Sequence, residues 1–208
     1  MLNARDAHSR IVISGISGRF PKSRTIADFK ENLYNKVDMV EPCKKELKAV
    51  NDETPDRYGQ TLDVDKFDSE FFGVPSGFQN NIDPQARMTL EHVYEAIIDA
   101  GIPPKSLRGS NTGVFVGSFS ADVHETSIRT GGGQEWVGCF RAFLANQISF
   151  ALDFKGPSLV VDTACSSSGY AADLAFKSIQ SGESDQAIVV GSNLILGTSM
   201  TFGLFKYV

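Results

Sequence analysis

Residues 159–175 read LVVDTACSSSGYAADLA, and the order of residue types in this stretch decides the fold. The apolar run at 159–162 has the length of a buried strand, and a tight turn follows it. From residue 166 to residue 180 small and apolar residues recur at helical spacing, and Gly182 is a typical C-terminal stop. The sequence therefore predicts a strand, a turn and a helix, with Cys165 at the start of the helix.

Short strands and helices alternate through most of the rest of the chain. Apolar runs predict further strands at residues 11–16, 112–117 and 186–190. Helical spacing predicts helices that begin after the capping residues Thr25 and Asp83, and another at residues 140–149. Strands that alternate with helices indicate an α/β fold with a mostly parallel sheet covered by helices.

Residues 38–80 interrupt this pattern with an irregular, polar region that contains several Pro and Gly residues. Three phenylalanines lie in it, Phe67, Phe71 and Phe72. Because large aromatic side chains need to be buried, we expect a long loop that packs on the core rather than a linker.

The composition is that of an ordinary globular protein. Of the 208 residues, 41% are hydrophobic and 22% are charged, and the formal net charge is −5. No run of Lys or Arg occurs. This argues against nucleic acid or an anionic membrane as the main partner, because both are bound chiefly by clustered positive charge.

No segment has the character of a targeting sequence or a membrane span. Residues 1–9 form a polar N-terminal arm without the apolar stretch of a signal peptide. Residues 186–205 carry no charge and are long enough to span a bilayer, but they contain Gly, Ser, Thr and Asn residues. We therefore expect a buried strand followed by a loop in this segment, and a cytoplasmic protein.

Cys165 is the candidate catalytic residue. At a helix N-terminus it faces unpaired backbone N–H groups and the positive end of the helix dipole, both of which stabilise a thiolate relative to a thiol. The same N–H groups, including that of Cys165, can stabilise a developing oxyanion. The small residues of the helix predict close packing, with the nucleophile buried at the end of a pocket. The alternative is a buried, inert cysteine.

The other two cysteines, Cys43 and Cys139, lack this setting and are expected to be structural. No CxxC spacing, metal-like His grouping, GxGxxG or Walker A pattern occurs, so we expect neither a metal site nor a nucleotide site in this segment. An odd and sparse cysteine count also fits a reducing compartment.

The string DTACSSS at residues 162–168 resembles the active-site motif of β-ketoacyl synthases, the condensing enzymes of fatty acid and polyketide synthesis. Six further strings resemble the same family in order and spacing: ISGISGRFP (13–21), FDSEFFGV (67–74), DPQARMTLEHVYEAIIDAGI (83–102), SLRGSNTGVFVG (106–117), DFKGPS (153–158) and AIVVGSNLIL (187–196). Within the family the chain most resembles the animal-type multifunctional fatty acid synthase, and iterative polyketide synthases are close relatives.

The resemblance implies a thiolase-like fold and a ping-pong reaction at Cys165. The thiol would accept an acyl group from a phosphopantetheine thioester on an acyl carrier protein. A malonyl carrier thioester would then be decarboxylated and condensed with it to a β-ketoacyl product. The resemblance also implies a homodimer, no cofactor in this segment, and NADPH only in other domains of a complete synthase.

The chain also departs from the family. There the second step depends on two histidines and a lysine from the second half of the domain, with one histidine in an HGTGT-like string. The three histidines here, His8, His92 and His124, lie in neither family string. We therefore expect residues 10–208 to be the N-terminal portion of a β-ketoacyl synthase domain without its C-terminal half, and inactive on its own.

Two single residues depart from the family as well. Gln147 stands where Arg is usual, and Gly169 stands where Leu is common. Gly169 is a candidate for widening the space beside Cys165. Phe143 and Leu144 are candidates for lining an acyl channel or a dimer contact, although packing in the core explains them equally well.

Other functions stay open. An iterative polyketide synthase would carry the same motifs. A noncatalytic ketosynthase-like fragment would contribute a dimer surface or a docking face for a carrier protein, and the absent histidines favour it for this chain as it stands. An unrelated cysteine hydrolase is disfavoured, because no histidine follows Cys165.

Overall fold

The computed structural model describes residues 10–42, 57–75, 82–119 and 140–194. These residues belong to two compact units. The larger unit consists of residues 10–16 and Phe67–Leu194, and the smaller unit contains Ser17–Lys66. Cys165 and the strand and helix around it lie in the larger unit.

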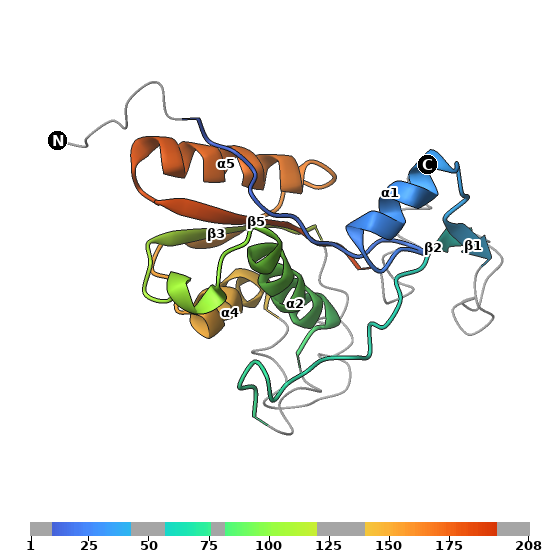
Figure 1. Ribbon diagram of the computed structural model, residues 1–208, viewed down its shortest axis with the longest axis horizontal. Coiled ribbons are helices and arrows are strands. Elements are labelled where there is room, and N and C mark those ends of the chain that lie inside the picture. The colour runs from blue at the N-terminus through green and yellow to red at the C-terminus, as the bar shows by residue number, and fades with distance from the viewer. Residues whose placement is uncertain (1–9, 43–56, 76–81, 120–139, 195–208) are drawn as a thin grey trace. The chain divides into compact units, whose positions relative to one another are not determined.

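A three-stranded parallel sheet forms the centre of the larger unit (Figure 1). Its strands are β3 (Thr112–Gly117), β4 (Ser158–Val161) and β5 (Gln186–Gly191), in the order β4-β3-β5. Gly117, the last residue of β3, lies opposite both Val161 and Gly191. The carboxyl ends of the three strands therefore meet at one edge of the sheet, and all three were expected from the sequence.

Helices cover both faces of this sheet (Figure 1). The helices α2 (Pro84–Asp99) and α4 (Arg141–Leu152) lie on one face, and α5 (Ser167–Ser181) lies on the other. A short 3-10 helix, η2 (Pro104–Leu107), contacts α2 and α4. The architecture is the predicted α/β arrangement with a parallel sheet between helices.

The alternation of side chains along β3 divides the core in two. Val114 and Val116 point toward α2 and α4 and are fully buried among apolar residues of these helices. Phe115 points the opposite way and packs against Ala171 and Ala175 of α5. The small side chains of α5 allow this helix to lie close to the sheet.

The ends of the helices follow the capping residues seen in the sequence. The carboxylate of Asp83 accepts a hydrogen bond from the N–H of Gln85 at 2.7 Å, and Pro84 is the first residue of α2. Gly182 ends α5 with a φ of 78°, a left-handed conformation that glycine adopts without steric cost.

The strand predicted at residues 11–16 is absent from the sheet, and this prediction was wrong. Val12 and Ile13 are 73% and 90% exposed. The backbone N–H of Ile16 donates instead to the carboxylate of Asp99 at 2.9 Å, at the end of α2. An apolar run alone therefore does not determine whether a segment pairs with a sheet or lies against a helix.

The phenylalanines of the irregular region are only partly buried. Phe67 and Phe72 stack with ring centroids 5.6 Å apart and pack against the core. Phe71 makes an edge contact with Tyr94 of α2 at 5.0 Å but remains 57% exposed. The prediction of burial is confirmed in part, since one of the three rings lies largely at the surface.

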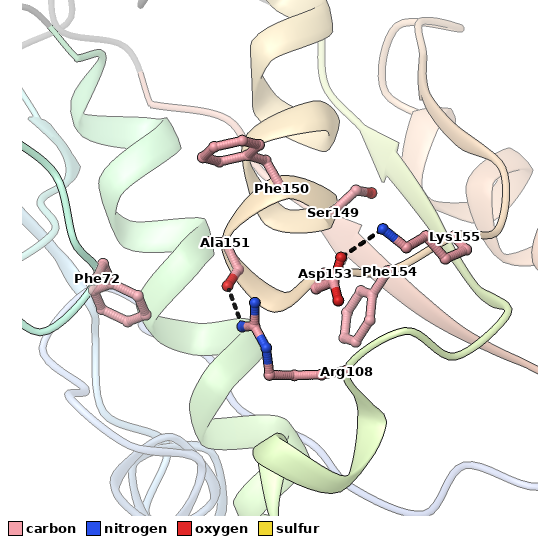
Figure 2. A pocket seen from close by; sticks show the side chains of 8 residues that line it. All are labelled: Phe72, Arg108, Ser149, Phe150, Ala151, Asp153, Phe154 and Lys155. Carbon is pink, nitrogen blue, oxygen red and sulfur yellow. Dashed lines mark hydrogen bonds and ion pairs between the residues drawn. The ribbon is translucent and has the colours of Figure 1, made fainter.

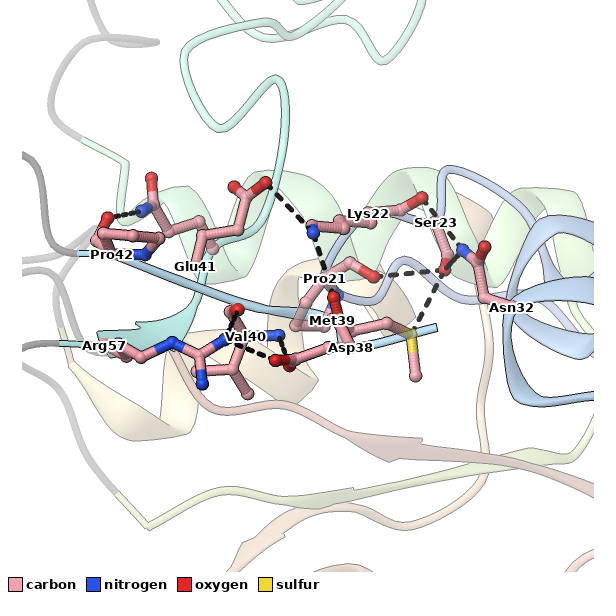
Figure 3. A network of polar contacts seen from close by, with 11 residues as sticks. Pro21, Lys22, Ser23, Asn32, Asp38, Met39, Val40, Glu41, Pro42 and Arg57 are labelled. Carbon is pink, nitrogen blue, oxygen red and sulfur yellow. Dashed lines mark hydrogen bonds and ion pairs between the residues drawn. The ribbon is translucent and has the colours of Figure 1, made fainter. Parts of the chain in front are cut away.

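The smaller unit contains α1 (Ile26–Tyr34) and a two-stranded antiparallel pair, β1 (Val40–Pro42) and β2 (Arg57–Gly59). Thr25 and Asp28 form a capping box at the start of α1, as their spacing predicted. Figure 3 shows the polar contacts around these elements, where Asn32 donates to the buried Ser23 hydroxyl at 3.0 Å.

The same network contains an ion pair between Arg57 and Asp38 (Figure 3). The hydrogen bond from Arg57 holds the pKa of the Asp38 carboxyl below its ordinary value. None of these side chains has a chemistry that suggests a site, so we assign the network a structural role.

The uncharged segment at 186–205 begins with β5, as expected, and its residues 195–205 lie outside the described part of the chain. Among the helices that the structure describes, none has both the length and the apolar character needed to cross a bilayer.

Candidate active site

The site lies where the three parallel strands end. Asp162 follows β4, Ser118 follows β3 and Ser192 follows β5. The N–H of Ser118 donates to the carbonyl of Val161 at 3.1 Å, and the N–H of Ser192 donates to the carbonyl of Gly117 at 3.0 Å. In open α/β sheets, binding sites lie outside the carboxyl ends of the strands, which makes this edge the first place to look for function.

The start of α5 is seated directly on this edge. A Cβ on Gly117 would lie 2.5 Å from the carbonyl carbon of Ser167, closer than real Cβ atoms approach. A Cβ on Gly191 would meet the side chain of Ser168 at 3.0 Å. The two glycines at the ends of β3 and β5 therefore let the first turn of α5 rest on the strand ends.

The turn between β4 and α5 is held by side chains on both of its flanks. Ala164 has a φ of 54°, in the left-handed region that costs a residue with a Cβ about 1 to 2 kcal/mol. The buried hydroxyl of Ser167 accepts from the N–H of Thr163 at 2.9 Å and donates to the carbonyl of Ala164 at 2.6 Å. The hydroxyl of Ser166 donates to the carbonyl of Thr163 at 2.8 Å. These bonds fix an unfavourable backbone conformation next to Cys165.

Cys165 itself is a free thiol at the surface of the described part of the chain. It directly precedes Ser166, the N-cap residue of α5, so its predicted position at the start of the helix is confirmed. The prediction that the thiol would be buried at the end of a pocket was wrong for this part of the chain. The strand ends and α5 support the turn from beneath, and no described side chain covers the sulfur atom.

An ion pair behind this turn was not anticipated from the sequence. Arg141, the first residue of α4, donates one hydrogen bond to Asp162 and another to the carbonyl of Phe119. The other carboxylate oxygen of Asp162 accepts from the N–H of Ala164 at 3.1 Å. The hydrogen bonds from Arg141 and Ala164 hold the pKa of Asp162 below its ordinary value.

The candidate residues for an acyl channel lie on α4 and α5. Leu144 is buried in the core, and Phe143 is half-buried and packs against the same core. A Cβ on Gly169 would have no atom within 4 Å among the described residues, so the space beside it is open. Packing accounts for the positions of Phe143 and Leu144, and a role of any of the three in acyl binding stays a prediction.

The remaining residues singled out in the sequence lie away from the turn or outside the described residues. Gln147 is buried and its amide donates to the carbonyl of Ala86 at 2.5 Å, which links α4 to α2. His92 lies on α2, where its ring contacts the carboxylate of Glu95 at 2.8 Å. Outside the described residues lie His8, His124, Cys43 and Cys139.

A surface hollow of about 590 Å³ lies at the opposite end of α4 (Figure 2). Phe72, Phe150 and Phe154 line it together with charged residues. Arg108 donates to the carbonyl of Ala151 at 3.0 Å, and Lys155 forms an ion pair with Asp153 at 2.5 Å. Cys165 is not among its lining residues, so this hollow is separate from the candidate site.

The fold and the turn together define an α/β protein with a candidate cysteine nucleophile at a strand-turn-helix junction. The chain belongs to the β-ketoacyl synthase family: the family described as "Beta-ketoacyl synthase, N-terminal domain" matches residues 8–207. This confirms the family expected from the motifs.

Two relatives illustrate the similarity in sequence. A fatty acid synthase of Anser anser anser is 44% identical over 197 residues, which cover 92% of this chain and 56% of that protein. A highly reducing polyketide synthase of Didymella fabae is 40% identical over 204 residues, which cover 91% of this chain and 11% of that protein. The chain thus spans about half the length of the first relative and a small part of the second.

Solved structures give the same result for the fold. An oxazolomycin ketosynthase domain of Streptomyces albus superposes with a TM-score of 0.83 at 32% identity, covering 94% of this chain and 36% of that one. The ketosynthase from module 6 of the bacillaene synthase of Bacillus subtilis gives 0.82 at 27% identity, covering 93% and 32%. The fold is therefore that of ketosynthase domains, the thiolase-like α/β fold predicted from the motifs.

Proposed function

We propose that this chain is the part of a fatty acid synthase ketosynthase that carries the acyl-accepting nucleophile. The observation that carries the proposal is the position of Cys165. Its thiol is exposed and precedes the N-cap of α5, on a turn whose backbone is fixed by Ser166 and Ser167. A nucleophile at this place is accessible to a substrate, and the backbone that carries it is held in place.

The first half-reaction is a transfer of the acyl group to Cys165. The thiolate attacks the carbonyl carbon of an acyl phosphopantetheine thioester, and the carbonyl oxygen becomes an oxyanion. The backbone N–H of Cys165 is the proposed donor to this oxygen. The intermediate then collapses and expels the pantetheine thiolate, which takes up a proton, and the acyl group remains on Cys165 as a new thioester.

The second half-reaction forms the carbon–carbon bond. A malonyl thioester loses carbon dioxide, and the resulting carbanion attacks the carbonyl of the acyl-cysteine and expels the Cys165 thiolate. None of the three histidines of this chain lies in the family strings that support this step. We propose that residues 10–208 are the N-terminal portion of the domain, and that the chain is inactive on its own.

The substrates and partners follow from the same proposal. The acyl and malonyl groups are delivered on phosphopantetheine by an acyl carrier protein, and this segment itself binds no metal or other cofactor. NADPH would be used by other domains of a complete synthase, in the cytoplasm. Gly169, on the helix that follows Cys165, is the proposed substrate contact near the thiol, and Phe143 and Leu144 are proposed to line an acyl channel although both pack in the core.

A homodimer is also proposed. In the described sheet β4 pairs with β3 on one side only, so its other edge presents backbone N–H and C=O groups. Such an edge readily pairs with another strand. Two copies related by a two-fold axis would place their β4 strands antiparallel, and the half-exposed side chains of Leu159 and Val161 would lie at the contact.

A polyketide synthase is the second candidate, because a relative that is 40% identical over 204 residues is described as a highly reducing polyketide synthase. The two candidates share the same site and chemistry. They differ in the product, and analysis of the products made by the protein that contains this chain separates them: saturated chains support the fatty acid assignment, and retained keto or hydroxyl groups support the polyketide one.

The nucleophile is tested with cerulenin, an electrophile directed at ketosynthases, on the protein that contains this chain. Labelling is expected to be lost in Cys165→Ala and kept in Cys43→Ala and Cys139→Ala, the matched controls. Labelling of Cys165→Ala at the level of the parent would contradict the assignment. A protein whose Cys165 is neither labelled nor acylated would instead be a noncatalytic scaffold.

A further inference from the structure

Arg141 and Asp162 are positioned to act on the turn that carries Cys165, although neither lies in it. One nitrogen of the Arg141 guanidinium binds the Asp162 carboxylate, and the other binds the carbonyl of Phe119. Phe119 lies two residues after the end of β3, and Asp162 lies one residue after the end of β4. The planar fork of the guanidinium therefore ties the ends of two adjacent strands together.

The contact continues from Asp162 into the turn. The carboxylate oxygen that does not bind Arg141 accepts a hydrogen bond from the N–H of Ala164 at 3.1 Å. Ala164 is the residue with the left-handed φ of 54°, and Cys165 follows it. Asp162 therefore connects the guanidinium on α4 to the one residue of the turn with a left-handed φ.

Arg141 does not stabilise the start of α4. A positive charge in the first turn opposes the helix dipole, and the N-cap residue Phe140 provides no side-chain hydrogen bond. Both choices are poor for a helix N-terminus. A local sequence that breaks the rules for its own element is expected where the residues serve another purpose.

The ion pair of Arg141 and Asp162 does not serve chiefly to stabilise the fold. The side chains of Arg141 and Asp162 are 44% and 35% exposed, and exposed ion pairs contribute little to the stability of a protein. The distinctive feature of the pair is its geometry. The guanidinium is a charged, forked donor, and its two acceptors lie at the ends of two strands. Such an arrangement is suited to holding a backbone in place.

We propose that Arg141 and Asp162 are positioning residues for the acyl transfer at Cys165. They hold the turn at Thr163 and Ala164, so that the thiol and the backbone N–H of Cys165 keep a fixed relation to an incoming thioester. The inference rests on the proposed function of Cys165 as the acyl acceptor, and it adds two residues that do not touch the substrate.

The test compares variants of the protein that contains this chain in three measurements. These are the rate of acylation of Cys165 by an acyl phosphopantetheine thioester, the rate of its alkylation by iodoacetamide, and the hydrogen exchange of the Ala164 amide. Alkylation needs neither an oxyanion donor nor a fixed approach of a thioester. It therefore reports an accessible thiol in a folded protein, whereas acylation also reports its position.

The expected results form a graded series. Asp162→Ala and Arg141→Gln slow acylation by roughly 10- to 100-fold and leave alkylation within about threefold of the parent. The amide of Ala164 loses protection in Asp162→Ala. Asp162→Asn keeps an acceptor for this amide, so the amide should retain its protection. Arg141→Lys keeps the positive charge but lacks the forked guanidinium. Both variants should recover part of the acylation rate. Arg108 is an exposed arginine that donates to the carbonyl of Ala151, so Arg108→Gln is the matched control. It should be acylated as fast as the parent.

Three outcomes overturn the inference. In the first, Asp162→Ala or Arg141→Gln is acylated as fast as the parent. In the second, the rates of acylation and alkylation fall together, which indicates that the thiol has become less accessible or less reactive in general and not that its position has changed. In the third, the Ala164 amide stays protected in Asp162→Ala. A parent protein that is not acylated at all contradicts the proposed function instead, and the exchange of the Ala164 amide then decides by itself whether Asp162 holds the turn.

Discussion

Gly117 and Ser167 approach each other so closely that no side chain fits between them: a Cβ on Gly117 would lie 2.5 Å from the carbonyl carbon of Ser167. Gly117 is the last residue of β3, and Ser167 is the first residue of α5. The contact sets the distance between the sheet and the first turn of the helix. It thereby fixes the position of the turn that carries Cys165 relative to the ends of the strands.

Gly117→Ala is therefore expected to destabilise the chain. The added methyl group meets backbone atoms, which cannot rotate away, so the cost should be that of overpacking, about 1 to 3 kcal/mol. Chemical denaturation followed by circular dichroism measures this difference in the free energy of unfolding.

Gly169→Ala, in the first turn of α5, is the matched control for Gly117→Ala. A Cβ at this position has no atom within 4 Å among the described residues, and alanine favours a helix over glycine by about 0.5 to 1 kcal/mol. This variant should be more stable than the parent. If both variants shift stability in the same direction, the close approach at Gly117 does not constrain the fold as described.

Gln85 is expected to hold the segment that follows β5. Its side chain is buried, and its carbonyl oxygen accepts from the hydroxyl of Ser192 and from the N–H of Leu194, each at 3.2 Å. Gln85→Leu removes the acceptor for both donors and should cost about 1 to 3 kcal/mol. Hydrogen exchange of the Leu194 amide should accelerate at the same time.

The comparison for this variant is Gln180→Leu, the same substitution at an exposed position of α5. Its effect should stay within about 0.5 kcal/mol, and the Leu194 amide should exchange as in the parent. Unchanged exchange in Gln85→Leu would show that another group holds this segment.

Asp162 should make the stability depend on pH in the acid range. Hydrogen bonds from Arg141 and from the Ala164 amide hold its pKa below the ordinary value of 3.8. The folded state therefore binds the proton less readily than the unfolded state. The carboxylate adds stability above the unfolded pKa, and this contribution is lost as the pH falls through the folded pKa.

Urea denaturation midpoints of the parent and of Asp162→Asn, measured from neutral pH into the acid range, check this prediction. The parent should be slightly more stable at neutral pH, since the ion pair is partly exposed and contributes little, and the difference should shrink below about pH 4. Other aspartates contribute equally to both proteins and cancel in the difference. Two curves that remain parallel over the whole range would mean that Asp162 has the same pKa in both states.

The chain alone should not decarboxylate malonyl thioesters. Its three histidines lie outside the family strings that support this step, and the described one, His92, contacts Glu95 on α2. Release of carbon dioxide from malonyl phosphopantetheine should match a protein-free control. Sustained turnover by the 208-residue chain would show that the missing histidines are not required.

Local patterns in the sequence were sufficient for most of the larger unit. The strand, turn and helix around Cys165 and the cap at Asp83 depend on residues a few positions apart, and each was found where the spacing placed it. Residues 11–16 failed as a strand, because pairing depends on a distant neighbour that an apolar run does not specify.

The site was predictable only in part for the same reason. The motif and the helix start predicted the position of Cys165 before α5, which the structure confirms, but its burial depends on parts of the protein distant in sequence. The pair of Arg141 and Asp162 joins residues 21 positions apart and exists only because α4 begins beside the end of β4. The one local signal was a cation at the start of a predicted helix, where a cation is unfavourable.

The most direct test of the account is the mass of Cys165 after exposure to a substrate. The protein that contains this chain is incubated with an acyl phosphopantetheine thioester, and its peptides are analysed by mass spectrometry. We expect one acyl group per chain, located on Cys165 and absent from Cys165→Ala. An acyl group on a different residue, or equal acylation of Cys165→Ala, would contradict the assignment of Cys165 as the acyl acceptor.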